Sequence, residues 1–97
     1  MNEQRILTLH PLGKAGVNIT KRRYDVIRNF IIETISEHHK ISYKDLTGLA
    51  EEKLAASFDG KVGWYIVTVK LDLEARGVIE RIPKTSPHLL RLAANKK

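Results

Sequence analysis

The spacing of apolar residues predicts a helix over residues 64–76 that leads directly into a strand. Ile66, Val69 and Leu73 recur every three or four positions and mark the inward face of this helix. Gly77 follows at the point where a helix commonly ends in a residue with positive φ, and β-branched residues come next. We expect the remaining elements to pack on this helix or to continue from its strand.

Two helices precede it, and each begins at a residue that can cap a helix. Thr20 is the expected N-cap of a helix that runs to about residue 38. Four apolar residues form the inward stripe of this helix: Tyr24, Ile27, Ile31 and Ile35. Ser42 and Asp45 have the spacing of a capping box, which predicts the start of a second helix. The inward side chains of that helix are expected to be Leu46, Leu49, Ala50 and Leu54.

Short strands are expected around these helices. Ile41 fits a small strand after the first helix, and residues 78–82 and 88–92 fit a hairpin. A proline lies at each end of the hairpin loop. Because proline has no backbone N–H, the loop residues do not join the strand pairing, and Lys84 is expected at the tip of the loop. The pattern therefore predicts an α+β, mostly helical domain over residues 20–92.

Residues 1–19 are expected to form an N-terminal arm, in which residues 5–9 are either a short strand or an extended stretch lying on the domain. Glycine and proline break regular structure over residues 10–16. This segment is either a flexible surface loop or a basic arm that touches nucleic-acid phosphates or a minor groove. Residues 93–97 are expected to be a frayed tail.

Three helices, a short strand after the first helix and a closing hairpin resemble a winged helix-turn-helix domain with a C-terminal β-hairpin wing and an N-terminal arm or strand. The run Leu71–Arg81 resembles the junction between third helix and wing in many bacterial regulators. The run His10–Lys14, together with Gly63-Trp64-Tyr65, is similar to a family of short uncharacterised bacterial proteins with a predicted winged-helix fold. The resemblance implies a fold, and only by analogy DNA, RNA or protein binding.

Composition narrows the classes of function. The chain has 97 residues and no cysteine, which indicates one domain without disulfides or thiolate metal sites. It shows neither a signal-peptide pattern nor a long apolar run, so we expect a cytoplasmic protein without a membrane partner. The four histidines are scattered, and no spacing argues for a catalytic set. We therefore predict no enzyme activity, no catalytic residue, no cofactor and no metal ligand.

The net charge of +6 permits an anionic partner, and the charge is concentrated at the two ends of the chain. Residues 1–42 carry seven Lys/Arg and four Asp/Glu, residues 43–76 carry five and six, and residues 77–97 carry five and one. If these cations bind nucleic acid, the phosphate contacts would come from Lys14, Lys21, Arg22, Arg23, Arg28, Lys61, Arg81 and Lys84. The alternative is that they are ordinary solvated surface.

The third helix lacks the polar outer face of a helix that reads DNA bases. Trp64, Val67 and Leu71 lie opposite its inward face, and Thr68 is its one credible base contact. Its two carboxylates, Asp72 and Glu74, are expected on the surface, where they would repel phosphate.

This apolar face needs a cover. The N-terminal arm, a DNA groove, or a homodimer or partner interface shared with Val26 and Phe30 of the first helix would each supply one. Two functions follow as expectations. The first is a small DNA-binding protein resembling a transcription regulator. The second is a protein-interaction or dimerisation module that does not bind DNA.

Overall fold

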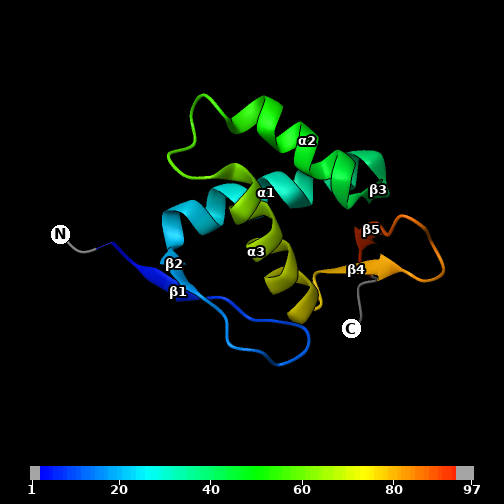
Figure 1. Cartoon of the computed structure of the whole chain (residues 1–97), viewed down its shortest axis with the longest axis horizontal. Coiled ribbons are helices and arrows are strands. Elements are labelled where there is room, and N and C mark those ends of the chain that lie inside the picture. The colour runs from blue at the N-terminus through cyan, green and yellow to red at the C-terminus, as the bar shows by residue number, and fades with distance from the viewer. Residues whose placement is uncertain (1–2, 94–97) are drawn as a thin grey trace.

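The computed structural model describes residues 3–93, and these residues form three helices and two small antiparallel sheets (Figure 1). The helices are α1 (Lys21–His38), α2 (Tyr43–Leu54) and α3 (Val62–Ala75). The strands are β1 (Arg5–Leu7), β2 (Asn18–Thr20), β3 (Ile41–Ser42), β4 (Ile79–Ile82) and β5 (Leu89–Leu92). The predicted α+β, mostly helical class is confirmed. Of the tail predicted over residues 93–97, all but Ala93 lies outside the described residues.

Local sequence signals set the helix ends as predicted. The Thr20 hydroxyl accepts a hydrogen bond from the Arg23 amide, and the Ser42 hydroxyl accepts one from the Asp45 amide at 3.0 Å. Gly77 has a φ of 76°, which lets the chain turn out of α3 and enter β4. Helix α3 begins at Val62, two residues before Trp64, and Val62 lies on its buried face with Ile66, Val69 and Leu73.

The core lies where the inward faces of the three helices meet. Ile27 and Ile31 of α1, Leu46 of α2, and Ile66 and Leu73 of α3 are completely buried. In Figure 1, α3 crosses in front of α1, with α2 along the upper edge of the pair. This packing stabilises all three helices, because most helical stability in proteins comes from burying an apolar face.

The C-terminal hairpin closes the other side of the core. Strands β3, β5 and β4 form a three-stranded antiparallel sheet in that order, with Ile41 opposite Leu90 and Leu90 opposite Arg81. Leu90 is fully buried, so the middle strand anchors the sheet to the helices. This arrangement matches the predicted order of three helices followed by a hairpin wing.

The N-terminal segment forms a hairpin. Its first strand was one of the two alternatives considered for residues 5–9, and its second strand was not predicted. Strand β1 pairs with β2 in an antiparallel register that places Ile6 opposite Ile19. Strand β2 has three residues, which is too short for an alternating pattern to stand out in the sequence. Ile19 is buried in the core, so the hairpin is an integral part of the fold.

Candidate interaction surface

The loop of the N-terminal hairpin lies along the outer face of α3 (Figure 1). Between them is a shallow groove with a volume of about 160 Å³. Its walls come from two segments of the hairpin, Thr8–His10 and Ala15–Val17, and from Trp64, Thr68 and Leu71 of α3. The outer face of the third helix is thus partly covered by the chain's own arm, which was one of the three covers considered from the sequence.

A buried carboxylate fastens the hairpin to α3. Asp72 is completely buried, and its Oδ1 accepts a hydrogen bond of 2.8 Å from the Leu9 amide. The Tyr24 hydroxyl donates to its other oxygen, and Arg76 Nε donates to both oxygens at 2.9–3.0 Å. One side chain therefore joins the arm, α1 and α3.

This environment changes how Tyr24 and Arg76 ionise. Burial raises the pKa of Tyr24 to about 12, and the hydrogen bond to Asp72 and its negative charge act in the same direction. The hydrogen bond to Asp72 raises the pKa of Arg76 as well. Tyr24 consequently stays a neutral donor throughout the physiological pH range.

The expectation that Asp72 and Glu74 face solvent was wrong. Asp72 lies about a quarter turn from the inward face of α3, and the hairpin closes over it. Glu74 is almost as enclosed, with ion pairs to Lys70 at 2.8 Å and to Arg81 at 3.4 Å. Both carboxylates are compensated by cations, so neither repels an approaching anion in the way predicted.

The hairpin loop closes by a tight backbone approach. Thr8 and Val17 exchange two hydrogen bonds, from the Thr8 amide to the Val17 carbonyl at 2.9 Å and from the Val17 amide to the Thr8 hydroxyl at 3.0 Å. A Cβ atom on Gly16 would lie 1.7 Å from the Thr8 carbonyl oxygen. Only glycine fits at this position, and this close approach gives the loop its path along α3.

Apolar side chains remain at the surface around the groove. Trp64 is 45% exposed and Leu12 in the loop is 75% exposed. Leu9 and Val17 are also exposed, whereas Leu71 and Val67 are half-buried. We call the surface made by Leu9, Val17, Trp64 and Leu71 the arm–helix face; exposed Leu12 lies in the loop of the same hairpin. The Trp64 ring packs edge-on against Tyr65, with ring centroids 4.8 Å apart, which leaves its outer side open.

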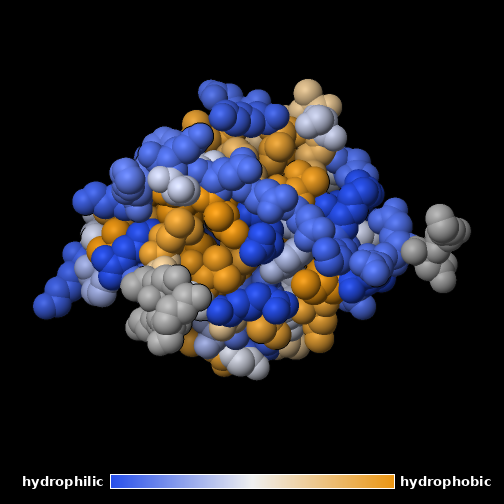
Figure 2. Space-filling model, turned by 180° about the vertical axis from the view of Figure 1, so that it is seen from behind, coloured by the Kyte–Doolittle hydropathy of each residue, from blue (hydrophilic) through white to orange (hydrophobic). Residues whose placement is uncertain are grey.

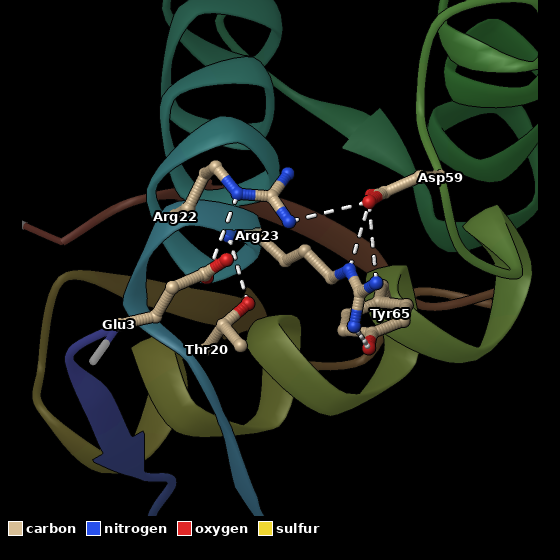
Figure 3. Close-up of polar contacts among 6 residues, drawn as sticks. All are labelled: Glu3, Thr20, Arg22, Arg23, Asp59 and Tyr65. Atoms are coloured by element: carbon tan, nitrogen blue, oxygen red, sulfur yellow. Dashed lines mark hydrogen bonds and ion pairs between the residues drawn. The ribbon is translucent and has the colours of Figure 1, made fainter. Parts of the chain in front are cut away.

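The arginines predicted to grip phosphate at the start of α1 are held in intramolecular ion pairs (Figure 3). Arg23 binds both oxygens of Asp59 at 3.0 and 3.2 Å, and Arg22 binds the same carboxylate at 3.2 Å. Arg23 also lies 3.4 Å from the Tyr65 hydroxyl, and Arg22 lies 3.6 Å from Glu3. The hydrogen bonds from Arg23 and then Arg22 hold the pKa of Asp59 well below its usual range.

The other predicted phosphate contacts are spread over the molecule. Lys21 pairs with Asp25 at 2.8 Å, and Arg81 pairs with Glu74. Within the described residues, four of the predicted cations have no carboxylate within 4.0 Å: Lys14, Arg28, Lys61 and Lys84. They lie in the arm loop, in α1, before α3 and in the wing. Figure 1 shows the wing and the start of α1 at opposite ends of the molecule. Thr68, the predicted base contact, lines the groove under the arm.

Val26 and Phe30, predicted to share an interface with Trp64, lie on α1 and do not line the groove. Val26 is exposed and Phe30 is partly buried against the core. Figure 2, the view from behind, shows apolar surface divided into separate areas by polar side chains. The arm–helix face combines three exposed apolar side chains, Leu9, Val17 and Trp64, with a groove.

The sequence profile of one protein family matches residues 5–90, which include the N-terminal hairpin, all three helices and most of the wing. The chain belongs to DUF6958, a family of unknown function. No curated protein and no solved structure matches the chain significantly. The family description carries no activity.

No helix within residues 3–93 is long and apolar enough to cross a bilayer. No group of three or more metal-ligating His, Asp or Glu side chains gathers among these residues.

Proposed function

We propose that the protein is a protein-interaction module that docks a partner through the arm–helix face. The observation that carries this proposal is the exposed Trp64 in a groove that exposed Leu9 and Val17 also line, with exposed Leu12 in the loop of the same hairpin. Contiguous apolar surface on a small protein commonly marks a binding site. Tryptophan is also the residue type most enriched among the side chains that contribute most to binding energy.

The position of the hairpin supports protein docking over base reading by α3. A helix that reads DNA lies in the major groove, which is about 12 Å wide, with its outer face against the bases. Here the arm lies across Thr68 and Leu71 and is fastened through the buried Asp72. Insertion of α3 into a groove would require the hairpin to leave, which would uncover that carboxylate and Ile19.

A cross-linking experiment tests the proposal. A photoreactive benzoylphenylalanine in place of Leu12 probes the arm–helix face, and the same residue in place of Lys53 on α2 is a control at another exposed position. We expect a discrete adduct in cells from position 12 that is absent from position 53 and is lost when Trp64→Ala is added. The same adducts from both positions, or none from position 12, would contradict the proposal.

DNA binding is the second candidate, and the net charge of +6 favours it. Lys84 in the wing and Lys14 in the arm loop are exposed and have no carboxylate partner among the described residues. Four phosphate contacts from the cations without ion pairs would give a log-log salt slope of about −4. Mobility of a mixed-sequence duplex, with Arg81→Glu plus Lys84→Glu as the comparison, tests this candidate. If the protein did not shift the duplex in about 50 mM salt, DNA binding would be rejected.

A further inference from the structure

We infer that the arm–helix face takes an acidic, amphipathic segment of another protein, which places one apolar side chain in the groove and carboxylates against Arg5, Lys14 and Lys61. This inference rests on the proposed function and names the chemistry of the partner. It is carried by the cations of the segments that build the face and by the size of the groove.

The segments that build the face carry exposed cations. Residues 4–20, which build the hairpin, contain Arg5 and Lys14 and no Asp or Glu. Lys61 stands one helical turn before Trp64 and is exposed. None of these three cations has a carboxylate within 4.0 Å in the described part of the chain, and the Arg5 guanidinium binds only the neutral side chain and carbonyl of Asn18.

The nearby carboxylates do not cancel this charge. Asp59 is shared by two arginines, and Asp72 is buried with Arg76 bound to it. Glu51 approaches α3 at Gly63, on the side where α2 packs. An apolar surface with cations around it favours a partner that has apolar side chains flanked by carboxylates, because opposite potentials align the partner and speed its encounter.

The shape of the groove favours a side chain over a flat surface. A cavity of about 150 Å³ in a protein can hold a benzene-sized group, so a groove of about 160 Å³ suits one leucine or phenylalanine side chain. A bilayer presents no such projecting group. A second copy of this chain would bring lysine against lysine around the contact, which disfavours a symmetric dimer through this face.

The single tryptophan makes the inference directly measurable. The probes are two synthetic 18-residue amphipathic helices without aromatic residues, one built from leucine and glutamate and the other from leucine and lysine. We expect the glutamate peptide to shift the emission of Trp64 to shorter wavelength in a saturable titration. The lysine peptide should bind at least about tenfold more weakly, because it places like charges together.

Two double variants distinguish the effect of charge near the arm–helix face from the effect of the protein's net charge on peptide affinity. The double variant Lys14→Glu plus Lys61→Glu should bind the glutamate peptide at least about tenfold more weakly than the wild type. Lys44→Glu plus Lys53→Glu on α2 changes the net charge equally and should leave the affinity within about twofold. All four lysines are exposed, so circular dichroism and urea midpoints near those of the wild type are expected for both variants.

Four outcomes would overturn the inference. The two peptides could bind equally, or neither could bind. The emission of Trp64 could shift only with vesicles of phosphatidylserine and phosphatidylcholine, which would indicate a membrane surface. The protein could sediment as a dimer that dissociates when Trp64→Ala is introduced. If any of these outcomes occurred while the cross-link at position 12 still formed, only the acidic character of the partner would be rejected, and the proposed docking function would remain. If the cross-link did not form, the proposed docking function itself would be rejected.

Discussion

Replacing Asp72 with alanine should destabilise the protein far more than removal of a surface carboxylate. Asp72 accepts hydrogen bonds from the Leu9 amide, the Tyr24 hydroxyl and Arg76, and it is completely buried. Alanine would leave the first two donors without an acceptor in a place that water does not reach freely. The arm would then lose the one side chain that ties Leu9 to α3.

The magnitude follows from those donors. A buried donor without a partner costs about 1–3 kcal/mol, and the Leu9 amide and Tyr24 hydroxyl each contribute such a penalty. Arg76 is partly exposed and can be rehydrated, so its lost ion pair adds little. We expect Asp72→Ala to lower the free energy of unfolding by about 3–5 kcal/mol, the usual range for breaking a buried pair. Asp72→Asn keeps the volume and one acceptor oxygen, and should lower it by about 1–2 kcal/mol.

Urea unfolding followed by circular dichroism and by Trp64 emission measures this loss. The matched control is Asp25→Ala, which removes the carboxylate of an exposed ion pair with Lys21 on α1 and should change stability by less than about 1 kcal/mol. In a domain of this size, the loss expected for Asp72→Ala lowers Tm by more than about 12 °C. If Asp72→Ala and Asp25→Ala unfolded within about 1 kcal/mol of each other, the assignment of Asp72 as the anchor of the arm would be refuted.

Three further predictions concern ionisation and backbone fit. Tyr24, with its pKa raised to about 12, should ionise at higher pH than a tyrosine in an unfolded chain, as an absorbance titration would show. Because Tyr24 in the unfolded chain ionises near pH 10, stability should fall as the pH rises from about 10 to 12, and Tyr24→Phe should remove that slope. The lowered pKa of Asp59 contributes stability that is present above about pH 4 and lost as the pH falls, so the urea midpoints of wild type and Asp59→Asn should converge in acid, and parallel curves would argue against the ion pairs. Gly16→Ala should destabilise the protein by at least about 1–3 kcal/mol through its clash with Thr8, whereas Gly48→Ala in α2, with nothing within 4 Å of the added Cβ, should stabilise it by about 0.5–1 kcal/mol.

The helices and the hairpin wing could be predicted because their signals are local. Thr20 and Ser42 act on amides three residues away, and Gly77 acts on its own backbone. The inward stripes repeat at the helical period, so Ile27, Ile66 and similar positions could be assigned to the core without knowledge of the partner helix. These are the parts of the fold in which a residue's neighbours in sequence determine its conformation.

The anchoring contacts could not be predicted, because they join residues far apart in sequence. Leu9 and Asp72 are 63 positions apart, and Arg23 and Asp59 are 36 apart. The sequence gives a weak signal for the first contact, since Asp72 stands between two leucines in the most apolar helix of the chain. For the second it gives none, because an Asp-Gly turn looks the same whether or not arginines from α1 reach it.

The prediction of an apolar outer face on the third helix depended on period alone, and it identified the surface that now carries the proposed function. The spacing of apolar residues could not show what covers this outer face. The hairpin lies over Thr68 and part of Leu71, whereas Trp64 remains 45% exposed and accessible to another molecule. That division depends on Gly16, whose missing side chain lets the loop close beside α3.

Hydrogen exchange of the Leu9 amide tests most directly the claim that the hairpin is fixed over α3. This amide donates to the buried Asp72, so it should exchange only when a large part of the fold opens, with a protection factor close to those of the core amides of α1 and α3. In Asp72→Ala the same amide should lose most of that protection. If the Leu9 amide of the wild type exchanged as fast as an unfolded chain while the helices stayed protected, the arm would be open in solution, the outer face of α3 would be free, and the account would be contradicted.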